Sequence, residues 1–339
     1  MPTILSGLIV HDELKKSLAA KIKALQEKRG GSPLTLAIIQ VGNRADSTAY
    51  INGKKKFATE IGVIVKLVNF QENVSQEEII YEIKKINQDK EITGIIVQLP
   101  LPKHFDEQAI LDAVDPAKDA DAITFTNIKR WTVDGESLQE EPLDNTRVAL
   151  VKADQYKGSP CTTMYPATAR GISELLDFYK ISLKGKRVCV IGRSKFVGTP
   201  IAALCRAKGA LVTICHSKTT DLKKETLASD IIISAVGKAG LITAEHVHEG
   251  QVVIDVGISE VVGDMKDKES KEEKKRKLVG DVDFEKVKAV IGEKGAITPV
   301  PGGVGPMTVL ALFENLVDCA INSQKSKVPS RKSRGNISR

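Results

Sequence analysis

The sequence lacks the features that would place the chain in a membrane or direct it out of the cell. It contains no run of eighteen apolar residues, and its start, MPTILSGLIVHDELKKSL, has neither the basic beginning nor the long apolar stretch of a secretory signal. No arginine precedes Arg29, which argues against a mitochondrial leader. We therefore expect a cytoplasmic protein with no membrane partner. Its 339 residues are enough for two domains with hydrophobic cores.

Cysteine and histidine are too few and too scattered for a disulfide framework or a metal cage. The five cysteines are odd in number and form no C-x-x-C pair. The five histidines are equally dispersed, and His246 and His248 are two residues apart, which is wrong for one helix face. We expect reduced cysteines that serve mostly in packing, and no metal.

Charge is concentrated in two segments. The net charge is +7, but residues 325–339 alone carry six basic and no acidic side chains, so the rest of the chain is close to neutral. This argues against a specific nucleic-acid partner, and the serine-rich composition predicts a disordered basic tail. A nonspecific contact of the tail with a polyanion is the alternative. In KDKESKEEKKRK, residues 266–277, eleven of twelve residues are charged, which predicts a solvated insertion.

The hydrophobic pattern alternates between strands and helices in two blocks. Between residues 34 and 102, strands LTLAIIQVG, VIVKLVNF and GIIVQLPLP enclose two helical segments, which gives a βαβαβ layout. Residues 128–160 lose this periodicity and predict a long loop or linker. A second alternation of predicted strands and helices runs from GKRVCVIG to QVVIDVG, and it predicts a Rossmann-type open parallel sheet.

A tyrosine and a lysine stand four residues apart in STAYINGKKK. On a helix, Tyr50 and Lys54 would share one face, whereas Lys55 and Lys56 need not. The alternative is a solvated basic face, because short charge runs commonly decorate exposed helices.

A turn bounded by glycines follows the predicted strand that ends at Ile191. In GRSKFVG, Gly192 and Gly198 flank the entry into the next helix, where backbone N–H groups and the helix dipole could approach a phosphate. The spacing is not G-x-G-x-x-G, so packing and cofactor binding remain equal alternatives.

The end of the next strand discriminates between cofactors. Cys215, His216 and Ser217 stand where an NAD-binding chain normally has an acidic ligand for the ribose hydroxyls. No carboxylate would repel a 2′-phosphate there, and Arg193 and Ser217 are available as donors, so NADP is favoured over NAD. A surface ion pair is the alternative role for Arg193.

Five segments together resemble the bifunctional methylenetetrahydrofolate dehydrogenase/cyclohydrolase family of one-carbon metabolism. They are, in the family's order, STAYINGKKKFATEIG, GIIVQLPLP, VIGRSKFVGTPIAALC, ICHSKT and ITPVPGGVGPMT, and they span residues 47–308. The resemblance implies an NADP-dependent oxidation of 5,10-methylenetetrahydrofolate and hydrolysis of the methenyl product to 10-formyltetrahydrofolate. It also implies a homodimer with a role in purine biosynthesis.

The resemblance further implies the architecture. Folate would bind in a cleft between an N-terminal α/β domain and a Rossmann domain, and a C-terminal helix would return to the first domain. We accordingly assign residues 1–150 and 306–324 to the folate and catalytic domain, 151–305 to the NADP domain, and 325–339 to the tail.

The implied catalytic residues are Lys54, Tyr50, Gln98 and Asp121. By resemblance, Lys54 is the catalytic lysine, Tyr50 stacks on the folate, Gln98 contacts Lys54, and Asp121 of KDADA binds the pterin. The alternative for Asp121 is a loop-capping aspartate. A lysine of ordinary pKa, about 10.4, is a poor base at neutral pH, so burial beside the cationic folate ring would usefully lower it.

The remaining implied ligands fall into two sets. Arg193 and Ser217 would hold the 2′-phosphate, and the loop from Pro299 to Pro306 would line the cleft. The full cofactor set is Gly192, Arg193, Ser194, Val197, Gly198, His216, Ser217, Gly237 and Ile258. The full substrate set is Tyr50, Lys54, Gln98, Leu99, Asp121, Pro299, Gly302, Gly303 and Pro306.

The chain departs from the family pattern near the substrate loops. Ala122 stands where the family usually has glycine, which could shift the loop that carries Asp121, and Ala169 of PATARG stands where it usually has proline. The stretch between Asn127 and Pro166 is longer than typical.

Two other functions compete with the bifunctional enzyme. One is a monofunctional dehydrogenase of the same family, against which Lys54 and Gln98 both argue. The other is a binding or regulatory protein with a basic nucleic-acid arm, against which the intact set of Tyr50, Lys54, Gln98 and Asp121 argues.

Overall fold

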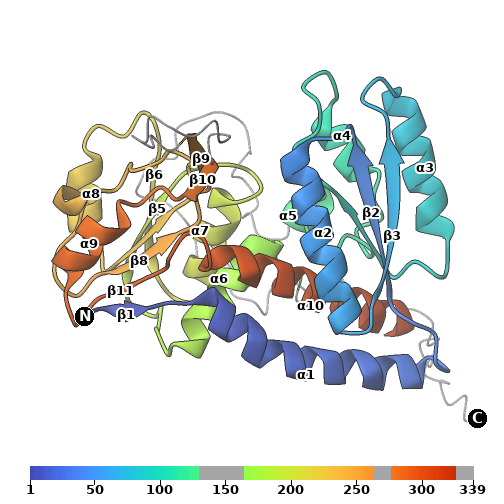
Figure 1. The fold of residues 1–339 in the computed structure, drawn as a ribbon, viewed down its shortest axis with the longest axis horizontal. Coiled ribbons are helices and arrows are strands. Elements are labelled where there is room, and N and C mark those ends of the chain that lie inside the picture. The colour runs from blue at the N-terminus through green and yellow to red at the C-terminus, as the bar shows by residue number, and fades with distance from the viewer. Residues whose placement is uncertain (130–163, 263–275, 326–339) are drawn as a thin grey trace, which may run out of the picture.

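The protein folds into two α/β lobes joined by two long helices, as Figure 1 shows. This computed structural model describes residues 1–129, 164–262 and 276–325. Most of the predicted loop at 128–160, most of the charged insertion at 266–277 and nearly all of the basic tail lie outside the described residues. Residues 128 and 129, placed in that loop by the sequence, instead end helix α5 (Phe125–Lys129).

The first lobe contains a three-stranded parallel sheet in the order β3-β2-β4. Its central strand is buried along its whole length, which explains the unbroken apolar run in the sequence. Helix α3 begins at the cap Ser75, whose hydroxyl accepts from Glu78 N (3.2 Å), and buries Ile79, Ile83 and Ile86. The predicted βαβαβ unit is confirmed. Its elements are β2 (Thr35–Val41), α2 (Ala45–Glu60), β3 (Ile64–Phe70), α3 (Gln76–Gln88), β4 (Gly94–Val97) and then α4 (Glu107–Asp112).

The second lobe contains a six-stranded parallel sheet in the order β1-β11-β8-β7-β5-β6. This confirms the predicted Rossmann-type sheet. Its strands are β1 (Thr3–Ile4), β5 (Arg187–Ile191), β6 (Leu211–Cys215), β7 (Ile231–Ser234), β8 (Val252–Asp255) and β11 (Ala296–Ile297). Its helices are α6 (Ala167–Phe178), α7 (Gly198–Ala207), α8 (Leu222–Leu227), the short 3₁₀ turn η2 (Ala244–His246) and α9 (Phe284–Ile291).

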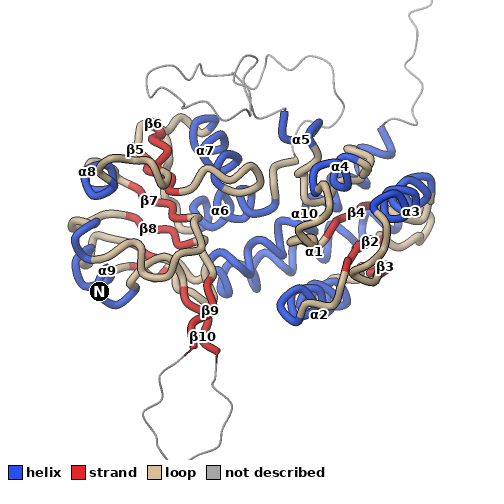
Figure 2. The backbone as a smooth tube through the Cα atoms, turned by 90° about the horizontal axis from the view of Figure 1, so that it is seen from above, coloured by secondary structure: helices blue, strands red, loops and turns tan. Residues whose placement is uncertain are grey.

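An antiparallel ribbon follows β8 and stands apart from the main sheet (Figure 2). It pairs β9 (Ser259–Val262) with β10 (Arg276–Val279). The last two residues of the predicted solvated insertion, Arg276 and Lys277, therefore belong to a strand. Their backbone pairing with Val261 and Val262 places them there in spite of their charge.

Helices α1 (Gly7–Lys28) and α10 (Val304–Lys325) pack against each other and connect the two lobes (Figure 1). Helix α10 also contacts α6, α2 and β4, so the predicted return of the C-terminal helix to the first lobe is confirmed. By length and composition α10 could cross a membrane, but 61% of its most apolar window is buried inside the protein. It is the core helix of the joint between the lobes.

Two glycines permit the close approach of these helices. A Cβ on Gly7, the first residue of α1, would collide with the carbonyl of Gly303. A Cβ on Gly171, within α6, would collide with the backbone of Met307 in α10. The GGVGPM segment is thus packed tightly between α1 and α6.

Candidate functional site

Helix α2 points Lys54 at the end of strand β4. Its Nζ donates a hydrogen bond to Gln98 Oε1 (3.0 Å), and Gln98 Nε2 donates to the Leu99 carbonyl (2.8 Å). The second bond fixes the orientation of the amide, so that its oxygen faces the lysine. Both side chains are partly buried. The predicted contact between Lys54 and Gln98 is therefore present in the structure.

The segment that carries Asp121 lies alongside β4. Ile95 N donates to the Lys118 carbonyl (2.7 Å), and Ala120 N donates to the Ile95 carbonyl (3.2 Å). These bonds extend the edge of the sheet and bring Asp121 to the same end of β4 as Gln98. Asp119, 3% exposed, accepts from Thr124 N (2.8 Å) and Asn127 Nδ2 (2.9 Å), which anchors the next turn.

Electrostatics couple Lys54 to Asp121. Burial lowers the pKa of Lys54 below its ordinary value, and the charge of Asp121 opposes this shift. Burial likewise raises the pKa of Asp121, and Lys54 opposes that shift. Burial raises the pKa of Asp119 to about 6, helped by the charge of Asp121. The site thus combines Lys54, whose lowered pKa favours the neutral amine, with Asp119 and Asp121, whose raised pKa values favour protonation.

Ala122 adopts the conformation that glycine would provide. Its φ is +57°, in the left-handed region, and its methyl group is fully buried against Met164 and Cys319. The alanine thus accepts the strain of a conformation that favours glycine. At the other departure, Ala169 is a buried residue inside α6, where it continues the helix.

Arg170 and Asn315 support the segment that precedes Asp121 through hydrogen bonds. Arg170 Nη1 donates to Asn315 Oδ1 (2.8 Å), which turns the Asn315 amide toward the carbonyls of Ala120 and Tyr165 (both 2.9 Å). The Asp121 carbonyl itself accepts from Ala167 N (3.3 Å). Helices α6 and α10 thereby fix the backbone on both sides of Asp121.

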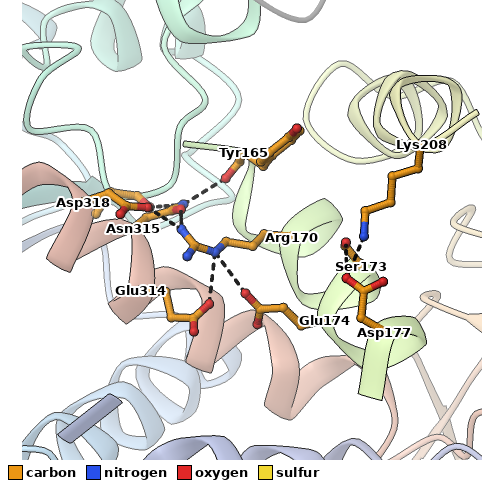
Figure 3. Close-up of polar contacts among 10 residues, drawn as sticks. Tyr165, Arg170, Ser173, Glu174, Asp177, Lys208, Glu314, Asn315 and Asp318 are labelled. Atoms are coloured by element: carbon orange, nitrogen blue, oxygen red, sulfur yellow. Dashed lines mark hydrogen bonds and ion pairs between the residues drawn. The ribbon is translucent and has the colours of Figure 1, made fainter. Parts of the chain in front are cut away.

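The same arginine is surrounded by carboxylates (Figure 3). Arg170 pairs with Glu174 and Glu314 at 3.0 Å each and with Asp318 at 2.6 Å. Burial and the adjoining Glu314 side chain raise the pKa of Glu174 to about 9. This shift favours protonation within the Glu174–Glu314 pair, which reduces the excess of negative charge in the cluster.

The other substrate residues predicted from sequence lie around this centre in different ways. Tyr50 is one turn before Lys54 on α2 and 47% exposed. The loop from Pro299 to Pro306 packs on the start of α1, where Leu8 N donates to the Gly302 carbonyl (3.2 Å). The hydrogen bond of this loop thus lies at α1, and its role in lining a substrate site stays a prediction.

The glycines of the predicted nucleotide turn have clear packing roles. Gly192 has a φ of +113°, and a Cβ there would collide with the Ala235 carbonyl. A Cβ on Gly198, the first residue of α7, would collide with the Gly192 carbonyl. Ser194 Oγ accepts from Gly198 N (3.2 Å), and Val197 is the residue that precedes the helix. Both glycines therefore have a packing role, and the binding of a phosphate at this turn stays a prediction.

Arg193 and Ser217 lie at the carboxyl ends of β5 and β6 and are both exposed. Burial, and then the charges of Arg193 and Lys218, lower the pKa of His216. His216 Nδ1 accepts from Lys218 N (3.1 Å), so the ring is a neutral acceptor on that side. Within the described part of the chain Arg193 forms no ion pair, and its role as a ligand of the 2′-phosphate stays a prediction.

The nucleotide turn reaches across to the first lobe. Lys195 Nζ donates to Gln108 Oε1 on α4 (2.5 Å), and Phe196 packs against the hydrophobic core of the first lobe. Lys195 also lies 6.0 Å from the centre of the Phe125 ring. The two halves of the candidate site are thus in direct contact through residues that the sequence did not single out.

Two further predicted cofactor residues occupy turns of the second lobe. Gly237 has a φ of +74° and follows β7, and Ile258 follows β8 and is 42% exposed. Ser259 Oγ donates to the Gly237 carbonyl (3.0 Å) and joins the two turns.

The described residues contain no group of three His, Cys, Asp or Glu side chains that could hold a metal ion. The four described cysteines are buried and form no disulfide, and Cys161 lies outside the described ranges.

Comparison with known proteins identifies both lobes. A model of the tetrahydrofolate dehydrogenase/cyclohydrolase catalytic domain matches residues 5–121, and a model of that family's NAD(P)-binding domain matches residues 166–324. The bifunctional protein FolD of Staphylococcus saprophyticus is 39% identical over 312 residues, covering 92% of this chain and 94% of the relative.

A longer relative and two solved structures are also similar. The mitochondrial C-1-tetrahydrofolate synthase of Schizosaccharomyces pombe is 39% identical over 94% of this chain, which spans only 29% of that protein. The crystal structure of FolD from Campylobacter jejuni has a TM-score of 0.78 at 35% identity, covering 95% of this chain and all of the other. The enzyme of Trypanosoma brucei, solved with NADP and an inhibitor, has a TM-score of 0.79 at 31% identity, covering 96% and 99%. The chain therefore belongs to the tetrahydrofolate dehydrogenase/cyclohydrolase family.

Proposed function

We infer that the protein catalyses two consecutive reactions: the NADP-dependent oxidation of 5,10-methylenetetrahydrofolate, and the hydrolysis of the resulting 5,10-methenyltetrahydrofolate to 10-formyltetrahydrofolate. The observation that carries this conclusion is the environment of Lys54. Its amine donates a hydrogen bond to Gln98, and burial lowers its pKa against the opposing effect of the Asp121 charge. A binding protein would have no need of a buried amine at this position, where it costs stability.

Proton transfer is the contribution of Lys54. In the hydrolysis, water adds to the methenyl carbon and loses a proton. The hydroxyl then loses its proton as the formyl C=O forms and the bond from this carbon to N5 breaks, and N5 gains a proton. The net reaction releases one proton, and a lysine whose pKa lies below the ordinary range can accept and return it. Gln98, which is neutral, orients the amine without adding a negative charge that would hold it as an ammonium.

Recognition of the pterin is the role we propose for Asp121. A carboxylate suits the paired N–H donors of the pterin ring in a bidentate fit. Asn315 and Ala167 fix the backbone around it, so that its direction is set before substrate binds. Tyr50, exposed on the same helix face as Lys54, is proposed to stack on the substrate, with Leu99, Pro299, Gly302, Gly303 and Pro306 as further contacts.

NADP fits the edge of the second sheet. Arg193 is exposed with no ion pair among the described residues, and no carboxylate stands at the end of β6, so a 2′-phosphate would meet a donor and no repulsion. The bound cofactor supplies the hydride acceptor. The chain's own residues orient it, and we propose Gly192, Arg193, Ser194, Val197, Gly198, His216, Ser217, Gly237 and Ile258 for this task.

The broader assignments rest on the family alone. We propose a cytoplasmic homodimer that serves purine biosynthesis, with tetrahydrofolate derivatives as its ligands and no specific nucleic-acid partner. We also propose the division of the chain into a folate domain at 1–150 and 306–324, an NADP domain at 151–305 and a tail at 325–339, with the exception that β1 (Thr3–Ile4) pairs in the sheet of the NADP domain.

One assay tests the proposed function directly. Purified protein receives 5,10-methylenetetrahydrofolate with NADP, and the absorbance of the methenyl product is followed as it appears and decays. Appearance followed by enzyme-dependent decay is expected. Appearance without catalysed decay would indicate the monofunctional dehydrogenase, and no appearance with either NADP or NAD would contradict the proposal.

A further inference from the structure

Two buried aspartates lie at the cofactor edge of the second sheet, outside the sites described above. Asp255 ends β8 and Asp281 follows β10, and their exposed fractions are 3% and 0%. Strand pairing sets Ser234, the last residue of β7, beside Asp255. Because ligands of open parallel sheets bind beyond the carboxyl ends of the strands, the aspartates stand directly behind the nucleotide edge.

The carboxylate of Asp281 holds a single turn. Its Oδ2 accepts from Ser234 Oγ and from Val236 N, both at 2.8 Å, and its Oδ1 accepts from Lys238 N (2.7 Å). All three donors belong to the segment 234–238, which also contains Gly237. Three hydrogen bonds to one buried carboxylate fix the path of this turn.

Asp255 holds Asp281 in turn. Its carboxylate accepts from Asp281 N (2.9 Å) and Val282 N (3.0 Å), while its own N–H donates to Thr298 Oγ1 (2.7 Å). Burial, with a contribution from the charge of Asp281, raises the pKa of Asp255 to about 7. One network thus connects the end of β11 to the turn after β7.

Two glycines make room for the pair. A Cβ on Gly257 would collide with the carboxylate of Asp281, and a Cβ on Gly280 would collide with that of Asp255. Both positions therefore need glycine, because any side chain would occupy the space of a carboxylate.

The held turns present apolar side chains to the surface. Val236 is 47% exposed and Ile258 is 42% exposed, and the bond from Ser259 Oγ to the Gly237 carbonyl (3.0 Å) joins their turns. Two exposed aliphatic groups on fixed backbone, beside the nucleotide edge, form a surface suited to the face of an aromatic ring.

We propose that Asp281 is a positioning residue for hydride transfer, which holds the Ser234–Lys238 turn where the nicotinamide ring must lie. This proposal rests on the proposed function. Asp281 acts through the turn and touches neither cofactor nor substrate. The hydrolytic step needs no nicotinamide, so it should be independent of this aspartate.

The test is Asp281→Asn in the full-length protein, with both activities measured. The amide keeps one acceptor oxygen but turns an NH₂ group toward N–H donors, so at least one hydrogen bond to the turn is lost. We expect the dehydrogenase kcat to fall by about tenfold or more, because hydride transfer depends steeply on ring placement. The KM for NADP should stay within about threefold, since Arg193 remains, and cyclohydrolase activity within about twofold.

Two further variants complete the test. Asp283→Asn changes an aspartate two positions away that pairs with Lys286 (2.8 Å), and it should leave both activities unchanged. Ser234→Ala removes one donor to Asp281 and should lower the dehydrogenase kcat by about two- to fivefold. If Asp281→Asn does not fold, the Ser234→Ala result decides.

Three results would overturn the proposal. They are an unchanged dehydrogenase kcat in folded Asp281→Asn, an equal loss of both activities, and an unchanged kcat in Ser234→Ala when Asp281→Asn does not fold. A wild-type protein without either activity would instead overturn the proposed function, so the two failures are distinguishable.

Discussion

The folate side and the nucleotide side of the candidate site differ in how far their functional groups are exposed to solvent. Around Lys54 the ionisable groups are enclosed, and burial shifts the pKa of Lys54 down and those of Asp119 and Asp121 up. At the nucleotide side Arg193 and Ser217 are exposed. Proton transfer at neutral pH requires a shifted pKa, whereas recognition of a phosphate requires only an accessible donor. Changes on the folate side should therefore alter chemistry, and changes on the nucleotide side should alter cofactor affinity.

Removing the amine of Lys54 should have the largest effect. Lys54→Met keeps most of the length of the side chain and loses its proton-carrying group, so cyclohydrolase activity should fall by about 10² to 10⁴, the usual contribution of a general acid–base group. Hydride transfer moves no proton, so dehydrogenase turnover should fall far less. Lys56→Met, on the exposed side of the same helix, is the control and should change neither activity. An equal loss of both activities in Lys54→Met would make Lys54 a substrate-positioning group.

Removing Arg193 should have the next largest effect, and on cofactor choice alone. A charged hydrogen bond is worth about 1.5 to 3 kcal/mol, so Arg193→Ala should raise the KM for NADP by about 10- to 150-fold and leave that for NAD almost unchanged. Initial rates at varied NADP and NAD measure this. Lys208→Ala, at the far end of α7, is the control. A similar increase for both cofactors would show that Arg193 supports the turn and does not recognise the phosphate.

A charge beside Lys54 should move the pH dependence of hydrolysis. The neutral Gln98 leaves the pKa of Lys54 lowered by burial, and hydrolysis should rise as the ammonium loses its proton. Gln98→Glu would stabilise the ammonium and move this rise toward higher pH by about one unit or more. Cyclohydrolase rates from pH 6 to 10 measure the shift, with Gln98→Met as the uncharged control. A rise that stays at the wild-type pH in Gln98→Glu would exclude Lys54 as the titrating group.

Relief of the backbone strain at Ala122, the residue after Asp121, should have the smallest effect. Ala122→Gly removes a left-handed strain of about 1 to 2 kcal/mol, but it also removes a buried methyl group worth about 0.8 kcal/mol and adds flexibility to the unfolded chain. The free energy of unfolding should stay within about 1 kcal/mol of wild type, with both activities unchanged. Ala122→Val, β-branched at the same φ, should be clearly less stable. Denaturant unfolding measures both, and a tolerated valine would contradict the assigned conformation.

The elements that the sequence predicted well are those with a strong local pattern. The strands from LTLAIIQVG to QVVIDVG follow from apolar runs, and the contact of Lys54 with Gln98 follows from family motifs. Long-range partners left no such signal. Arg170 joins Asn315 across 145 positions and Asp281 joins Ser234 across 47, and nothing in the spacing of these residues indicates the pairing.

Some features could not be judged from local composition. Arg276 and Lys277 belong to a strand, which the charged composition did not indicate, although Lys277 is exposed as expected. The effect of Ala122 could not be judged from sequence, because it depended on whether alanine would accept a positive φ. The aspartates of the second lobe could have been suspected from nearby glycines, since Gly257 lies two positions after Asp255 and Gly280 directly precedes Asp281.

The most direct test of the account is the ratio of cyclohydrolase to dehydrogenase activity, measured in one assay with Lys54→Met and Arg193→Ala at subsaturating NADP. The account predicts that Lys54→Met lowers the ratio by about 100-fold or more, with accumulation of methenyltetrahydrofolate. It predicts that Arg193→Ala raises the ratio by about tenfold or more, because only the dehydrogenase step needs the cofactor. Ratios that move in the same direction, or that stay at the wild-type value in both variants, would contradict the separation of chemistry from cofactor recognition.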